Sequence, residues 1–194
     1  MRIVGILLAA GRSERFGRDK LVAPLLSSID DIEAGTPIGV AACRHLAAAV
    51  PEVVAVVRSG DRVLAEMLRN PGARIVECAR ADEGMGASLA CGVQATSDAD
   101  GWLIALADMP WIKPATIASL VSALEGGADI VAPSYNGERG HPVGFARRHY
   151  AALAALTGDE GARAIVAAHK QNLVLVDVGD ERILADIDTP KDVS

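Results

Sequence analysis

The order of its apolar segments constrains the fold of this chain more than any other feature. Short continuous apolar runs alternate along the sequence with Ala-rich stretches of helical periodicity. Continuous runs, as opposed to alternating apolar and polar residues, are typical of strands covered on both faces. The predicted strands span residues 2–9, 52–58, 73–78, 102–107, 128–133, 143–146, 173–176 and 183–187. The predicted helices span residues 38–50, 61–70, 87–95, 114–124, 148–155 and 160–169.

This repeated strand–helix–strand order predicts an α/β fold with a doubly wound, mostly parallel sheet. The chain has 194 residues, which is close to the usual size of one domain, and no linker-like segment divides it. We therefore expect a single domain over residues 1–194. Aromatic residues make up only 3% of the chain, which suits Ala-rich helices that approach a sheet closely.

Charge, apolar run length and cysteine content exclude several classes of protein. The net charge of −6 disfavours general nucleic-acid binding. No apolar run approaches the ~20 residues that a membrane span needs. The cysteines are odd in number and form no C-x-x-C pair, so we expect neither a disulfide framework nor a structural zinc site, and we expect a reducing, cytoplasmic location. We expect small buried apolar roles for the cysteines and ordinary surface or boundary positions for the histidines of the helical patterns: Cys43, Cys78, Cys91, His45, His149 and His169.

The segment that follows the first predicted strand, residues 7–20 (LLAAGRSERFGRDK), has the composition of an anion-binding loop. Gly11 and Gly17 let the backbone turn back closely, so that its N–H groups can face a phosphate. Although the whole chain is acidic, residues 12–20 carry four basic and two acidic side chains. The glycine spacing fits neither the P-loop nor the dinucleotide-binding pattern. A solvated loop with an incidental charge cluster remains the alternative.

Two acidic positions stand near the ends of predicted strands. Asp108 directly follows the run 102–107, at the carboxyl edge where ligands gather in open α/β sheets. A carboxylate placed there suits Mg²⁺, which prefers oxygen ligands and bridges to phosphates. A turn or N-cap aspartate is the alternative. Asp186 and Asp188 lie on the same face of an extended segment because of its two-residue period.

The loops in the middle of the chain carry further polar candidates. Gly84 and Gly86 allow close backbone approach, and Ser88 can donate a hydrogen bond to a base or a phosphate. Ser88, Asp108 and His141 also occur in the order of a serine-hydrolase triad, but the apolar strand and the last glycine that such a motif requires are missing. Residues 158–163 are also compatible with a helix start that Asp159 caps.

Six segments, in order along the chain, resemble the molybdenum cofactor cytidylyltransferase family of the nucleotidyltransferase superfamily. The first loop resembles the family signature in the form L-A-A-G-R-S-x-R-F-G-x-x-K, with Phe16 in place of the usual Met. The other segments are G-M-G-x-S, A-D-M-P, R-G-H-P, G-D-x-G-A-R and D-I-D-T-P. The resemblance implies a Rossmann-like nucleotidyltransferase fold.

The same resemblance implies residue roles at the nucleotide. Arg15 and Lys20 would act on the phosphates, and Asp108 would complete the catalytic set. Asp108 and Asp188 would hold Mg²⁺, with Asp186 as the competing choice for the second ligand. The implied nucleotide contacts are Leu8, Ala9, Ala10, Gly11, Arg12, Lys20, Gly84, Gly86 and Ser88.

The resemblance also implies an acceptor site and a reaction. The implied acceptor contacts are Arg139, His141, Asp159 and Arg163. For His141, a turn histidine that is bonded to backbone is the alternative. The implied reaction is Mg²⁺-dependent transfer of CMP from CTP to the terminal phosphate of molybdopterin, with release of pyrophosphate. The L-A-A-G form favours CTP over GTP.

Three alternatives to this reaction stay open, and one segment departs from the family pattern. A related transferase would use GTP or a sugar-phosphate acceptor. A non-catalytic accessory protein would deliver cofactor to a client molybdenum hydroxylase. A serine hydrolase built on Ser88 is the third. The acidic segment 27–36 is longer than the corresponding stretch in relatives, which leaves the base and acceptor contacts near it unassigned.

Overall fold

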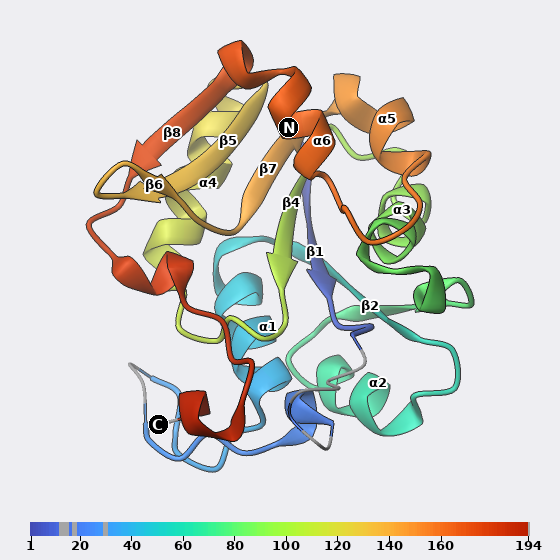
Figure 1. The fold of residues 1–194 in the computed structure, drawn as a ribbon, viewed down its shortest axis with the longest axis vertical. Coiled ribbons are helices and arrows are strands. Elements are labelled where there is room, and N and C mark those ends of the chain that lie inside the picture. The colour runs from blue at the N-terminus through green and yellow to red at the C-terminus, as the bar shows by residue number, and fades with distance from the viewer. Residues whose placement is uncertain (12–15, 17–18, 29–30, 194) are drawn as a thin grey trace.

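One eight-stranded sheet organises the residues that the computed structural model describes, which are 1–11, 16, 19–28 and 31–193. The strands are β1 (Ile3–Leu8), β2 (Glu52–Arg58), β3 (Arg74–Cys78), β4 (Gly101–Leu106), β5 (Ile130–Tyr135), β6 (Glu138–Arg139), β7 (Val143–Ala146) and β8 (Leu173–Asp177). Their order in the sheet is β3-β2-β1-β4-β7-β5-β6, and β8 pairs with β5 (Figure 1). Neighbours from β3 to β4 run parallel, as do β5 and β8, whereas β7 runs antiparallel to both β4 and β5. The predicted α/β fold with a mostly parallel sheet is confirmed.

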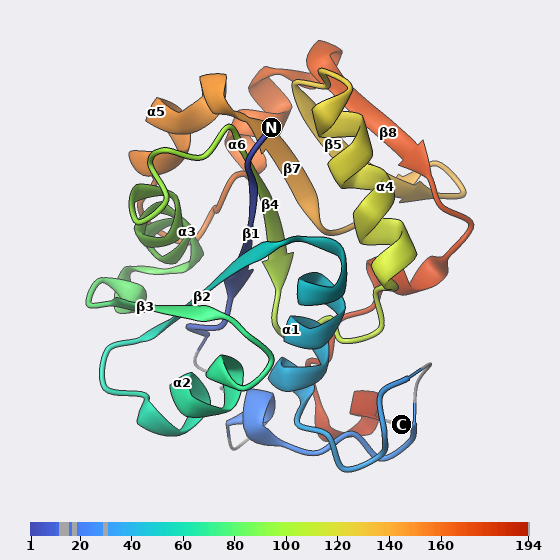
Figure 2. The same ribbon diagram turned by 180° about the vertical axis from the view of Figure 1, so that it is seen from behind.

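Helices cover both faces of the sheet. They are α1 (Ile38–Ala49), α2 (Arg62–Arg69), α3 (Met85–Gln94), α4 (Pro114–Glu125), α5 (Tyr150–Ala154) and α6 (Arg163–Ala168). Figure 1 shows α3, α5 and α6 on one face, and Figure 2 shows α1, α2 and α4 on the other. Side chains alternate along β1, so that Leu7 packs into the apolar core under α1, α2 and α4 while Ile6 packs into the core under α3 and α5. Among the described residues, no helix is both long and apolar enough to cross a membrane.

The strand order reverses its direction between β1 and β4. From β1 the chain passes through α1 to β2 on one side, whereas β4 lies on the other side of β1. The register pairs Leu8 with Leu106, so both strands end at the same level. In open α/β sheets, ligands bind in the crevice at such a switch point, beyond the carboxyl ends of the strands. The loops after β1 and β4 therefore lie where a ligand is expected.

The prediction of a strand at 183–187 is wrong. The 3-10 helix η6 (Glu181–Leu184) occupies its first half, and the Asp180 side chain begins this helix by accepting a hydrogen bond from the Arg182 N–H at 3.1 Å. The run is apolar because Ile183 and Ile187 are fully buried. They anchor a surface connection to the sheet instead of adding a strand to it.

The expectations for two cysteines and for two histidines are also wrong. Cys78 and Cys91 form a disulfide, whereas Cys43 is free and buried. The histidines on α1 and before α5 are buried instead of lying at the surface, since His45 is 2% exposed and His149 is 5% exposed. Composition did not reveal either feature, because each depends on which residues the fold brings together.

Candidate active site

Two adjoining cavities open at the carboxyl edge of the sheet. The first, of about 640 Å³, lies at the ends of β1, β2 and β4 and includes Ala10, Gly11, Lys20, Ser88 and Asp108 in its lining. The second, of about 380 Å³, lies between β4, β7 and α6. Both cavities share the side chains of Leu8, Met85 and Leu106 as a common wall. Two ligands bound in these cavities would therefore lie next to each other.

The first cavity begins where β1 gives way to the loop at Ala9. The Ala9 N–H donates to the Val56 carbonyl oxygen at 2.9 Å, which extends the β1–β2 pairing into the loop. The Ala10 carbonyl oxygen accepts from Nη1 of Arg58 at 3.1 Å. These bonds fix the backbone at the cavity floor. Arg12 and Arg15, for which the sequence predicts phosphate contacts, lie outside the described residues.

Lys20 lies in a cluster of charged side chains at the carboxyl end of β4. Its Nζ donates to Oδ2 of Asp108 at 2.8 Å and to the Ile187 carbonyl oxygen at 2.7 Å, and it lies 3.7 Å from Oδ1 of Asp188. The Lys20 side chain is only 12% exposed. This placement does not suit the alternative in which Lys20 belongs to a solvated loop.

A backbone bond holds the C-terminal segment against the end of β4. The Ile187 N–H donates to the Asp108 carbonyl oxygen at 2.9 Å. On the far side of Asp188, the Asp192 carboxylate accepts from the backbone N–H groups of Asp188 and Thr189, and the Thr189 bonds lower the pKa of Asp192. The backbone is thus tied on both sides of Asp188, which holds its carboxylate beside Lys20.

The positions of the two competing carboxylates differ. Asp188 lies beside Lys20, which also bonds Asp108, whereas Asp186 lines the second cavity. Within the described ranges, no cluster of three or more His, Cys, Asp or Glu side chains is suited to hold a metal ion. Asp108 and Asp188 alone supply two hard oxygen donors. That donor set fits Mg²⁺, which proteins commonly bind through one or two carboxylates together with substrate phosphates and water.

The glycines before α3 make room for a neighbouring loop. Gly84 has a φ of +124°, and a Cβ on it would meet Oδ1 of Asp159 and lie 2.6 Å from the Gly158 carbonyl oxygen. The Gly86 N–H donates to the same Gly158 oxygen at 2.7 Å. Asp159 does not cap α6, whose N-cap is Ala162, and it lines the first cavity instead of the second. The interpretation of Asp159 as a helix cap is therefore wrong, and the residue belongs to the lining of the first cavity.

We expect Gly84→Ala to unfold at clearly lower urea concentration than the wild type. The added methyl group collides with backbone, and the positive φ adds strain of about 1–3 kcal/mol. Gly127→Ala is the matched control, because Gly127 has a φ of +97° and a Cβ there would meet nothing within 4 Å. Equal losses of stability in the two variants would contradict the close approach at Gly84.

Ser88 is bound within its own helix. Its Oγ donates to the Gly84 carbonyl oxygen at 3.2 Å, and the residue is 4% exposed. It lies in the first turn of α3 (Met85–Gln94), which follows the 3-10 helix η3 (Ala81–Glu83) and not a strand. A hydrolase nucleophile stands on a sharp turn directly after a strand, so this geometry disfavours the serine-hydrolase alternative.

The second cavity combines basic side chains with apolar walls. Arg139, His141 and Arg163 line it together with Ile104 and Phe145. The backbone N–H of His141 donates to the Ile183 carbonyl oxygen at 3.0 Å, while its buried Nδ1 has no hydrogen-bond partner among the described residues. Burial lowers the pKa of His141, and the charges of Arg139 and Arg163 lower it further, against the opposing effect of Asp108. At neutral pH the imidazole of His141 is therefore neutral, and the residue lines the second cavity while its Nδ1 stays buried.

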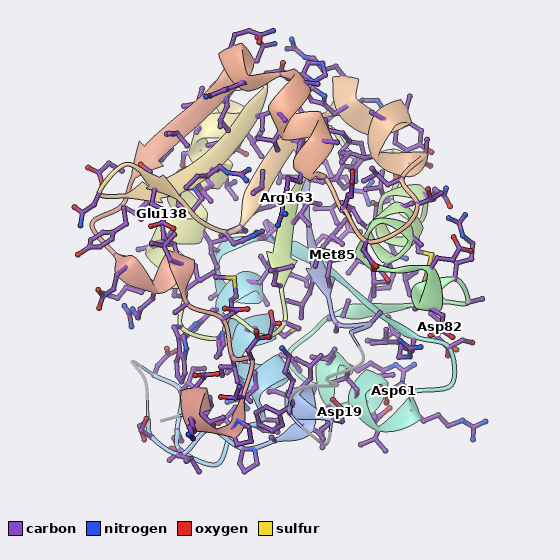
Figure 3. All side chains as sticks on the ribbon, viewed as in Figure 1. Asp19, Asp61, Asp82, Met85, Glu138 and Arg163 are labelled. Carbon is purple, nitrogen blue, oxygen red and sulfur yellow. A yellow bond between two sulfur atoms is a disulfide. The ribbon has the colours of Figure 1, made fainter. Side chains whose placement is uncertain are left out.

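Among the residues that line the first cavity without a role in the sequence predictions, Arg58 and Met85 stand out. Arg58, at the end of β2, bridges the cavity by bonding Ala10 on one side and pairing with Asp82 of η3 on the other. Met85 lies in the wall between the cavities, and Figure 3 labels it between Arg163 and Asp82. The position of Arg58 at the carboxyl end of a predicted strand is a signal that would have identified it.

Comparisons with known proteins agree with this architecture. Residues 5–173 match the family described as "MobA-like NTP transferase domain". Purine catabolism protein PucB of Bacillus subtilis (strain 168) is 27% identical over 201 residues, which cover 98% of this chain and 93% of that protein. Nicotine blue oxidoreductase of Paenarthrobacter nicotinovorans is 28% identical over 196 residues, which cover 96% and 92%.

Solved structures show the same fold. Rv0371c from Mycobacterium tuberculosis H37Rv superposes with a TM-score of 0.81 at 26% identity, over 99% of this chain and 95% of that one. Mth528, titled a nucleotidyl transferase from Methanothermobacter thermautotroptrophicus, has a TM-score of 0.80 at 23% identity, over 98% and 94%. The sheet and its switch point are therefore an arrangement that other proteins share.

Proposed function

Since this chain belongs to the MobA-like NTP transferase family and is a nucleotidyltransferase, we propose that it transfers CMP from CTP to the terminal phosphate of molybdopterin. The observation that carries the proposal is the cluster of Lys20, Asp108 and Asp188, of which Lys20 and Asp108 line the first cavity. Asp108 lines the first cavity and acts electrostatically on His141, which lines the second. A nucleotide in the first cavity and an acceptor in the second would meet beside these charges.

The proposed reaction needs no side-chain nucleophile. An oxygen of the acceptor phosphate attacks the α-phosphorus of CTP, the bond between this phosphorus and the bridging oxygen to the β-phosphate breaks, and pyrophosphate leaves. Such a transfer depends mainly on positioning and on neutralising negative charge. The backbone at Ala10 and Gly11 would hold the nucleotide, and Lys20 would donate to its phosphates. When bound, Mg²⁺ held by Asp108 and Asp188 would neutralise phosphate charge.

Residues of the second cavity support an acceptor that carries phosphate on a flat ring system. Arg139 and Arg163 supply donors for a phosphate, and the arginine fork suits phosphate geometry. Phe145 and Ile104 supply an apolar wall for a ring, and His141 lines the same cavity. The preference for CTP rests on the L-A-A-G form of residues 8–11.

We expect pyrophosphate release with molybdopterin and Mg²⁺ to be at least about tenfold faster with CTP than with GTP at equal subsaturating concentration. A tenfold difference corresponds to about 1.4 kcal/mol of transition-state preference. Sugar phosphates serve as control acceptors and are expected to give background release. Faster turnover with GTP than with CTP, or with a sugar phosphate than with molybdopterin, would indicate a different transferase reaction. A stable complex with an apo-molybdenum hydroxylase without any nucleotide turnover would favour the accessory role.

A further inference from the structure

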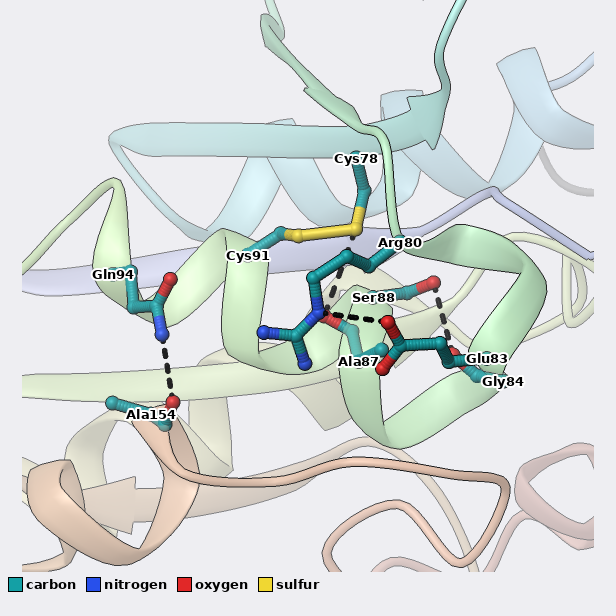
Figure 4. Close-up of a disulfide and its surroundings, with 9 residues drawn as sticks. All are labelled: Cys78, Arg80, Glu83, Gly84, Ala87, Ser88, Cys91, Gln94 and Ala154. Carbon is teal, nitrogen blue, oxygen red and sulfur yellow. Dashed lines mark hydrogen bonds and ion pairs between the residues drawn. A yellow bond between two sulfur atoms is a disulfide. The ribbon is translucent and has the colours of Figure 1, made fainter.

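The Cys78–Cys91 disulfide closes the segment that forms one wall of the nucleotide cavity. Cys78 is the last residue of β3, and Cys91 lies in the second half of α3 (Figure 4). Between them, Ala81, Asp82, Gly84, Met85 and Ser88 all line the first cavity. The bridge therefore joins the two ends of a stretch that touches the proposed nucleotide site along much of its length.

Besides the bridge, both local and long-range contacts hold this segment: Asp82 pairs with Arg58, and the Gly86 N–H donates to the Gly158 carbonyl oxygen at 2.7 Å. Arg80 pairs with Glu83 at 3.2 Å, and Ser88 donates to the Gly84 carbonyl oxygen. At the far end of α3, Nε2 of Gln94 donates to the Ala154 carbonyl oxygen at 2.7 Å and holds the helix against α5. Opening the disulfide would leave the segment with these bonds but without the covalent link between its two ends.

The two sulfur atoms differ in their surroundings. Cys78 is 1% exposed, and its Sγ lies 3.7 Å from the Ala87 carbonyl oxygen. Cys91 is only partly buried, at the edge of the apolar cluster beneath α3. An incoming thiol therefore has access to the bridge from the side of Cys91, and Cys78 is the sulfur that leaves.

We propose that Cys78–Cys91 is a thiol–disulfide exchange site for dithiol reductants and that its redox state sets the affinity of the adjoining cavity for nucleotide. The proposal rests on the proposed function for the identity of the nucleotide, but the exchange reaction itself does not depend on it. The oxidised form holds residues 79–90 in the geometry that lines the cavity. The reduced form lacks this covalent restraint, so residues 79–90 sample more conformations, and ordering them again opposes nucleotide binding.

The dithiol by itself supplies all the electrons and protons that the thiol–disulfide exchange needs. One thiolate of the reductant attacks Sγ of Cys91, a mixed disulfide forms, and Cys78 leaves as a thiolate that takes up the proton lost by the attacking thiol. The second thiol of the reductant then displaces Cys91 and closes the reductant's own disulfide. The protein gains two electrons and two protons, and the dithiol loses the same.

The third cysteine does not compete in this exchange. Cys43 lies on α1, is fully buried, and its Sγ lies 4.0 Å from the Leu68 carbonyl oxygen. Burial raises the pKa of the Cys43 thiol to about 11. At pH 8 only about one Cys43 in a thousand is therefore the reactive thiolate.

The test compares the protein before and after treatment with dithiothreitol. Alkylation under denaturing conditions is expected to label one cysteine in the protein purified without reductant and three after reduction, because only Cys43 is free. Calorimetric titration with CTP is expected to show a Kd about tenfold higher in the reduced protein, which corresponds to about 1.4 kcal/mol. Hydrogen exchange at the amides of residues 79–90 is expected to quicken after reduction.

Variants separate the bridge from general effects of the reductant. Cys91→Ser is expected to bind CTP like the reduced wild type and to ignore dithiothreitol, whereas the control Cys43→Ala keeps the full response. An equal Kd for CTP together with equal hydrogen exchange at residues 79–90 in the oxidised and reduced wild type would overturn the proposal. Three free thiols in the protein purified without reductant would also overturn it. Absence of CTP binding in both states would count against the proposed function. Hydrogen exchange at residues 79–90 would then test the thiol–disulfide exchange site by itself.

Discussion

Replacing Asp108 with Asn is expected to lower the rate of pyrophosphate release by about 10³-fold or more while the protein stays folded. The substitution keeps the shape of the side chain and the backbone oxygen that accepts from the Ile187 N–H. It removes the negative charge that bonds Nζ of Lys20 and that we propose as a ligand of Mg²⁺. The measurement is turnover at saturating CTP and acceptor, with circular dichroism and urea unfolding to check the fold.

Asp100→Asn is the matched control for this experiment. Asp100 lies just before β4, at the opposite end of the strand from Asp108, and its carboxylate accepts a hydrogen bond from the Arg2 backbone N–H at 2.7 Å. An amide oxygen retains that bond, so we expect turnover close to that of the wild type. Retained Mg²⁺-dependent pyrophosphate release in Asp108→Asn would exclude Asp108 as the metal ligand.

Replacing Lys20 with Met is expected to lower turnover by about 10²-fold. Methionine has nearly the same length but cannot donate to a phosphate or balance the charges of Asp108 and Asp188. We expect the Kd for CTP to rise as well, because Lys20 lines the first cavity, which we propose as the nucleotide site. Steady-state kinetics with CTP and direct titration separate the two effects.

Lys113→Met provides a control on an exposed lysine outside both cavities, and we expect it to behave like the wild type. Lys20→Arg tests whether charge alone is sufficient, since the bulkier guanidinium group does not fit the same bonds to Asp108 and Ile187. A near-normal rate in Lys20→Met would restrict Lys20 to holding the C-terminal segment through the Ile187 carbonyl oxygen.

The predictions that succeeded for the fold rest on local patterns. The bounds of β2 and β7 are those predicted from continuous apolar runs. Helix α4 begins at Pro114, where a proline suits the first turn. The strand predicted at 183–187 failed because burial of Ile183 and Ile187 has the same apolar signature as a strand, although the backbone there forms no ladder. Apolarity reports burial, and only pairing with a neighbour makes a strand.

For the candidate site, the sequence supplied the residues and the tertiary structure supplied their neighbours. Gly11, Lys20 and Asp108 stand out because each lies in a polar segment near the end of an apolar run. Lys20 and Asp108 are 88 positions apart, and Lys20 and Ile187 are 167 apart, so no local pattern specifies that they bond. The packing of Asp159 against Gly84 and the role of Arg58 as a bridge also appeared only in the folded chain.

By itself, the sequence determined the α/β class, the mostly parallel sheet and the segments that form the carboxyl edge, because periodicity and turn chemistry are properties of neighbouring residues. Only the tertiary structure decided that β7 runs antiparallel within the sheet, that Asp188 and not Asp186 lies beside Lys20, and that Cys78 and Cys91 are joined. The first two features are contacts between positions far apart in the sequence, and the third joins two elements, β3 and α3, that pack together only in the fold. They depend on how the two faces of the sheet pack, which the local sequence does not encode.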